Sequence, residues 1–133
     1  MDASSQRAPF DELCLRIASG RAASRLLSSW VSQFDLKEPE FRLLWLLREE
    51  STRLDQSQVA ELMASSHAQV SALVERLRGG GYLSGSSAPG DRRRSLWSIT
   101  PTGRALLQKI ELHASGEMRC ATPPFSPPRR AAA

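Results

Sequence analysis

The 133-residue sequence has little cysteine and no long apolar run, and each shortage excludes a class of protein. Cys14 and Cys120 lie far apart without a CxxC pair, which argues against a disulfide framework and a zinc site. The two histidines, His67 and His113, have no second ligand at metal-binding spacing. No stretch approaches the roughly 18 apolar residues of a membrane span, and the N-terminus lacks the apolar core of a signal peptide. We therefore expect a reduced, cytoplasmic protein with no membrane association, no metal and no cofactor.

A catalytic constellation is also missing from the sequence. No nucleophile, base and orienting group stand together in it. The triplet Gly79-Gly80-Gly81 lacks the preceding strand and the lysine of a phosphate-binding loop. We expect that the chain is not an enzyme.

What is present is a globular composition with an uneven distribution of charge. Hydrophobic residues make up 41% of the chain and charged residues 24%, which fits one folded domain. Residues 1–50 have 7 basic and 8 acidic groups, whereas residues 51–133 have 11 and 6. A basic excess in one part suggests a polyanionic partner such as nucleic acid, and a solvated basic face is the alternative.

Two helices are predicted ahead of the basic part. Residues 1–9 are expected to be flexible. Apolar residues at helical spacing then predict an amphipathic N-terminal helix within 10–36, although its end near Ser32 is uncertain. Pro39 suits the first turn of a second helix, whose residues 41–47 are apolar nearly all round and so belong at the centre of the core. The apolar residues of the first helix include Phe10, Leu13, Cys14, Ile17 and Leu27.

A helix-turn-helix is predicted over residues 55–78. Asp55 with Gln58 three residues later forms a capping-box pattern ahead of apolar residues, and Ser66 begins a second short helix almost at once. Two short helices joined this tightly are typical of a helix-turn-helix. Their expected core residues are Val59, Leu62 and Met63, then Val70, Leu73, Val74 and Leu77.

A β-hairpin and a final helix follow the helix-turn-helix. The glycine triplet ends the second helix, and residues 82–84 and 95–99 predict two short strands around a polar loop, a wing over 82–99. Thr100 and Pro101 begin a helix over 101–116. The domain is expected to span 10–118, with a disordered proline-rich tail over 119–133. The predicted fold class is mainly α with a small β-hairpin wing, a winged helix-turn-helix with flanking N- and C-terminal helices.

This order of elements predicts that one face of the second short helix enters a DNA major groove while the wing reaches the neighbouring minor groove. Gln69 can bond adenine, Ser71 a base edge or a phosphate, and an alanine methyl a thymine methyl. Two structural alternatives stay open: Gln69 completes a capping box with Ser66, and Arg76 pairs with Glu75 or another neighbour. The candidate major-groove residues are His67, Ala68, Gln69, Ser71, Ala72 and Arg76.

The loop of the wing contains the second group of candidates. Arg92, Arg93 and Arg94 suit a narrow minor groove, where the negative potential is enhanced, and Asp91 could orient one of them. A solvated turn with ordinary surface charge is the alternative. The predicted partner is double-stranded DNA.

From Leu54 to Gly103 the sequence resembles the MarR family, the multiple-antibiotic-resistance type of bacterial winged-helix regulators. The resemblance implies a homodimer that binds a pseudo-palindromic operator, usually to repress, with small phenolic or other ligands or oxidants weakening the complex. Arg93 matches the wing arginine of the family and Asp91 its partner. The matching segments are Gln58-Val59-Ala60, Val70 to Leu77, Gly81-Tyr82-Leu83, Asp91-Arg92-Arg93-Arg94 and Ile99-Thr100-Pro101-Thr102-Gly103.

The chain departs from the family near its C-terminus. Members generally have a further long helix there, which Pro123 and Pro124 forbid. A homodimer would then form through the N-terminal helix and the helix from Thr102. Cys14 is similar to the sensing cysteine of the hydroperoxide-responsive branch, although the accompanying tyrosines are absent and a cysteine buried on an apolar face is usually inert. A winged-helix protein-interaction module with weak or no specific DNA binding is the alternative function.

Overall fold

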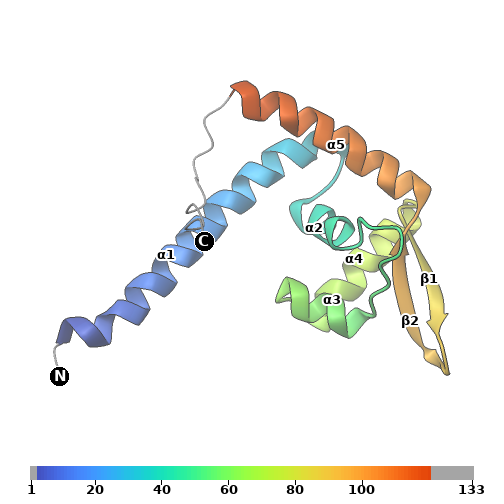
Figure 1. The fold of residues 1–133 in the computed structure, drawn as a ribbon, viewed down its shortest axis with the longest axis horizontal. Helices are drawn as coiled ribbons and strands as arrows, with labels where there is room; N and C mark the ends of the chain where they lie inside the picture. Colours follow the sequence, from blue (N-terminus) through green and yellow to red (C-terminus); the bar gives the residue numbers. More distant parts are fainter. Residues whose placement is uncertain (1–2, 121–133) are drawn as a thin grey trace, which may run out of the picture.

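The computed structural model describes residues 3–120 and has the predicted fold class, a mainly helical winged helix-turn-helix (Figure 1). The prediction of a disordered tail and the effect of Pro123 and Pro124 fall mostly outside the described residues. In chain order the elements are α1 (Ala3–Val31), the 3-10 turn η1 (Ser32–Phe34), α2 (Glu38–Leu46), α3 (Gln56–Met63), α4 (His67–Gly79), β1 (Leu83–Ala88), β2 (Asp91–Ile99) and α5 (Pro101–Cys120).

The first helix begins earlier than the sequence predicted and ends close to Ser32, short of residue 36. Residues 3–9, expected to be flexible, are helical, and several of them are good helix formers. At the other end α1 stops at Val31, because the chain continues as the 3-10 turn η1. Asp35, which ends this turn, adopts a left-handed conformation with φ 57°. A short aspartate tolerates this conformation better than most side chains do. The helix therefore cannot extend to residue 36.

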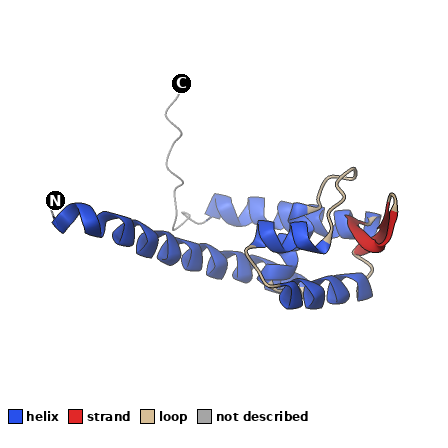
Figure 2. Ribbon diagram, turned by 90° about the horizontal axis from the view of Figure 1, so that it is seen from below, coloured by secondary structure: helices blue, strands red, loops and turns tan. Residues whose placement is uncertain are grey.

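Most of α1 projects away from the rest of the molecule. Figures 1 and 2 show its N-terminal part running out alone from the helical body. Its side chains from residue 5 to residue 18 are all exposed, including Phe10 at 69% and Ile17 at 55%. The apolar stripe of Phe10, Leu13 and Ile17 is thus uncovered in the single chain.

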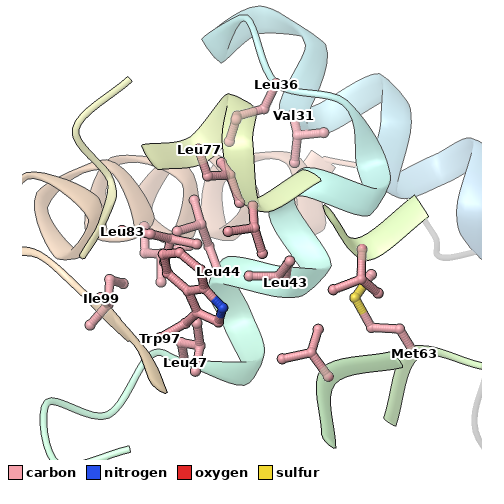
Figure 3. Packing of buried hydrophobic residues seen from close by; sticks show 14 of the residues in the cluster. Val31, Leu36, Leu43, Leu44, Leu47, Met63, Leu77, Leu83, Trp97 and Ile99 are labelled. Atoms are coloured by element: carbon pink, nitrogen blue, oxygen red, sulfur yellow. The ribbon is translucent and has the colours of Figure 1, made fainter. Parts of the chain in front are cut away.

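The core forms around α2. The Glu40 carboxylate accepts a hydrogen bond from the Lys37 backbone N–H at 2.9 Å and so caps the start of this helix. Leu43, Leu44 and Leu47 are fully buried, as expected for a helix apolar nearly all round. Figure 3 shows Leu43 and Leu44 between Met63 of the helix-turn-helix and the indole of Trp97, and Leu47 beside that indole. The other fully or nearly buried residues include Val59, Val70, Val74, Leu77, Leu83, Ile99, Leu107 and Ile110.

The helix-turn-helix consists of α3 and α4 joined by a tight turn. Asp55 Oδ1 accepts from the Gln58 N–H at 2.8 Å, and Gln58 Oε1 accepts from the Asp55 N–H at 2.9 Å. Ala64, with φ 50°, ends α3 in the left-handed conformation, and α4 begins at His67. Leu62 is 61% exposed, so the expectation that it belongs to the core is wrong.

The wing has longer strands than the sequence predicted. β1 and β2 pair as an antiparallel hairpin through Leu83 and Ile99 at its base, and only Pro89 and Gly90 separate them at the tip. The prediction missed this extension because the serine-rich β1 lacks the alternation that indicates a strand. A bridge between Leu54 and Trp97, with N–H to O distances of 3.2 and 2.7 Å, joins the hairpin to the segment before α3.

The start of α5 is tied closely to the base of the wing. The Thr100 hydroxyl accepts from the Gly103 N–H at 3.1 Å and donates to the Gly81 carbonyl at 2.6 Å. The helix continues to Cys120, beyond the predicted end at residue 116 and the predicted domain end at 118. The helices of the described residues include none that is long and apolar enough to span a membrane.

Candidate nucleic-acid interface

The exposed side of α4 contains all six residues that the sequence proposed for the major groove. Val70, Val74 and Leu77 turn the opposite side into the core. Helical geometry divides the six into two flanks. His67, Ala68 and Ser71 lie on one flank, and Gln69, Ala72 and Arg76 lie on the other.

The Gln69 flank faces α2 and is partly engaged in contacts within the protein. Gln69 Oε1 accepts from the Ser66 N–H at 3.1 Å, and the Ser66 hydroxyl accepts from the Gln69 N–H at 3.2 Å. Gln69 therefore completes a capping box with Ser66 in this structure, which is one of the two structural alternatives that the sequence left open. Its amide can contact a base only by giving up this bond or by using its N–H donors.

Arg76 is likewise paired, although not with Glu75. Its Nε lies 3.5 Å from Oε2 of Glu40, whose side chain is only 5% exposed. Glu75 is instead 3.9 Å from Arg78. Arg76 thus connects α4 to the capping carboxylate of α2 while remaining half exposed. Ser71 has no comparable contact on its flank among the described residues, which leaves its hydroxyl available.

The wing arginines occupy an irregularity in the hairpin. Ser87 pairs with Ser95, and the next residue of β1, Ala88, pairs with Asp91. The three residues Arg92–Arg94 therefore have no pairing partner on β1. An extra segment in one strand bends that strand and re-aims its side chains. The register shift therefore leaves three exposed arginines outside the strand pairing.

Only one of the three arginines has an ionic partner within the described part of the chain. Arg94 Nε and Nη2 both lie 2.6 Å from Oδ2 of Asp55. Asp91, expected to orient an arginine side chain, instead accepts from the backbone N–H of Arg93 at 3.0 Å. This contact shapes the turn, and the cations of Arg92 and Arg93 stay exposed without an ion pair to any described residue.

Asp55 is the site residue whose second role the sequence did not reveal. Its hydrogen bond from the Gln58 backbone lowers the pKa of this carboxyl, and Arg94 lowers it further. The capping motif predicted the first contact because it is local. Arg94 lies 39 residues away, and only the hairpin brings it close.

The remaining sequence candidates lie elsewhere. Cys14 is exposed on the projecting part of α1, so the expectation of a buried thiol is wrong for the single chain. The side chain of Cys120 is not among those that the structure describes. Among the residues that the structure describes, no group of three or more possible ligands could hold a metal ion.

The helices, the turn and the hairpin together define a winged helix-turn-helix protein. Residues 34–94 match the sequence model of the MarR family. This match agrees with the family resemblance that the sequence predicted. No curated protein sequence matches it.

Several solved structures are similar to the chain. A mutant MarR from E. coli complexed with operator DNA has 18% identity and a TM-score of 0.69, covering 90% of this chain and 83% of its own. A mutant S. aureus MepR bound to an oligodeoxyribonucleotide has 17% identity and a TM-score of 0.67, covering 86% and 83%. Bordetella bronchiseptica BpsR, whose DNA binding 6-hydroxynicotinic acid regulates, has 25% identity and a TM-score of 0.66, covering 87% and 81%.

Proposed function

We propose that this DNA-binding transcriptional regulator is a repressor that reads its operator with α4 in the major groove and Arg92 and Arg93 of the wing in the minor groove. The observation that supports this best is the register shift in the hairpin. It leaves two exposed arginines outside the strand pairing, on the segment of β2 that lies near the start of α3. Arginine follows the enhanced negative potential of a narrow minor groove and also binds phosphate.

Binding of the full chain to duplex DNA from the region upstream of its own coding sequence tests this proposal. Phosphate contacts release counterions, so log affinity should fall with log salt by about 0.9 for each neutralised phosphate. Repression should appear as reduced transcription from the bound fragment. A chain without salt-sensitive DNA binding would favour the alternative of a winged-helix module that docks on protein.

Ser71 and Gln69 are expected to differ in how they affect sequence preference. Ser71→Ala should change the ranking of operator variants and cost about 1 kcal/mol at the base it contacts, because its hydroxyl is available. Gln69→Ala should affect preference less and instead lower protein stability by about 1 kcal/mol, because its amide belongs to the α4 capping box. Binding to a library of variant duplexes, together with thermal unfolding, measures both effects. Equal changes in preference would show that Gln69 leaves its cap on DNA.

We also propose that the chain is a homodimer through α1 and α5. An isolated helix gains little stability without packing, yet the projecting part of α1 presents the exposed stripe of Phe10, Leu13 and Ile17. On α5, Leu112 is also exposed. A two-fold dimer would present two α4 helices to a pseudo-palindromic operator.

A charge placed in this stripe should separate the subunits. Leu13→Glu is expected to weaken the dimer about tenfold or more, because a carboxylate would be buried in an apolar contact. The mass from light scattering across a concentration series measures the effect. Leu15→Glu, on the opposite side of the same helix, is the control and should leave the mass unchanged. A monomeric wild-type chain would contradict the dimer.

A further inference from the structure

The contact between Asp55 and Arg94 joins two parts of the candidate DNA interface. Asp55 precedes α3, the first helix of the helix-turn-helix, and Arg94 belongs to the unpaired segment of β2. One oxygen of the carboxylate caps α3 at 2.8 Å from the Gln58 N–H. The other lies 2.6 Å from both Nε and Nη2 of Arg94. A single side chain therefore holds the start of α3 and the wing together.

The helix cap makes this contact stiffer than an ordinary surface ion pair. The Asp55 side chain is 14% exposed and that of Arg94 49%. The carboxylate is already fixed by the cap, so little side-chain entropy remains to be lost when the guanidinium binds. The bridge between Leu54 and Trp97 fixes the base of the wing on the same side. Together the two contacts restrain the hairpin at two points along its length.

We propose that Asp55 and Arg94 form a latch that positions the wing, and that Arg94 acts within the protein and not as a DNA contact. This inference rests on the proposed function. Of the three wing arginines, Arg92 and Arg93 then bind DNA, and Arg94 sets the angle at which they are presented relative to α4. Asp55 is accordingly a positioning residue of the interface.

Three variants separate this role from a direct contact. Asp55→Asn keeps a good N-cap and removes the ion pair, and Arg94→Gln removes it from the other side. Each should weaken binding to the upstream duplex about fivefold, because the wing is then less well positioned. The double variant should bind no more weakly than either single variant, because all three lack the same contact. Glu61→Gln on α3 is the charge-matched control and should not weaken binding.

The salt dependence distinguishes positioning from phosphate contact. Arg94→Gln should leave the slope of log affinity against log salt unchanged, whereas Arg93→Ala should reduce its magnitude by about 0.9. A reduced slope for Arg94→Gln would overturn the latch by making Arg94 a DNA contact. Tighter binding by Asp55→Asn would overturn it too, because Asp55 would then compete with DNA for Arg94.

A measurement without DNA tests the latch even where the proposed function fails. Trypsin cleaves after arginine, and the three wing arginines lie in one exposed segment. Asp55→Asn should speed cleavage within the wing several-fold relative to wild type and Glu61→Gln, because local opening becomes easier. Unchanged cleavage would overturn the latch. Wild-type protein that does not bind DNA yet shows this difference would contradict only the DNA-binding proposal.

Discussion

Replacement of Gly103 by valine is expected to destabilise the fold by about 3 kcal/mol. Gly103 lies in the first turn of α5, where this helix meets the base of the wing. A Cβ at this position would stand 2.5 Å from the Tyr82 carbonyl oxygen and 2.8 Å from Cγ1 of Ile99. The Tyr82 carbonyl is backbone that also accepts from the Thr100 N–H at 3.0 Å, so it cannot move without breaking that bond.

Chemical denaturation of the full chain measures this loss as a lower midpoint. Gly116→Ala is the control within the same helix, because a Cβ there would have no heavy atom within 4 Å. This control should be neutral or gain about 0.5–1 kcal/mol from the better helix former. If Gly103→Val unfolds at the same denaturant concentration as wild type, α5 does not pack against the wing this closely.

The double variant Arg92→Ala and Arg93→Ala is expected to lower affinity for the upstream duplex about 50-fold at 0.1 M salt. Each arginine that neutralises a phosphate contributes about 0.9 to the salt slope, so the two arginines together contribute almost two decades of affinity between 1 M and 0.1 M salt. The decrease should be similar for all duplex sequences, because backbone contacts do not read bases. Neither side chain is needed for the hairpin, since both lie outside the strand pairing.

Titration of affinity against salt is the decisive measurement for this pair. The slope should become shallower by about 1.8 in the double variant and by half as much in each single variant. Arg48→Ala removes an exposed cation from the loop after α2 and should leave the slope unchanged. A double variant with the wild-type slope would show that the wing does not touch DNA.

The starts of the helices could be predicted because local contacts determine them. Asp55 with Gln58, Ser66 with Gln69, and Thr100 with Pro101 fix helix starts within a few residues, and the structure has helices that begin at these positions. The core of α2 was predictable for a similar reason, since a helix that is apolar nearly all round belongs at the centre of the core.

Contacts distant in sequence could not be predicted from the same patterns. Asp55 meets Arg94 only because the hairpin folds back over α3, and the register shift that exposes Arg92 has no signature in a serine-rich strand. The stripe on α1 was visible in the sequence. An amphipathic pattern does not say whether its own chain or a partner covers the apolar side, so the exposure of Cys14 came only from the structure.

The register shift also separates what can vary in this protein from what cannot. Residues 92–94 stand outside the ladder, so changes in their chemistry leave the pairing between Ser87 and Ser95 intact. Trp97 allows no such freedom, because a Cβ on the facing Gly85 would lie 2.8 Å from its Cζ3. Residues 92–94 can therefore change during evolution to fit new operators, whereas the pair of Gly85 and Trp97 has to stay the same to preserve the fold.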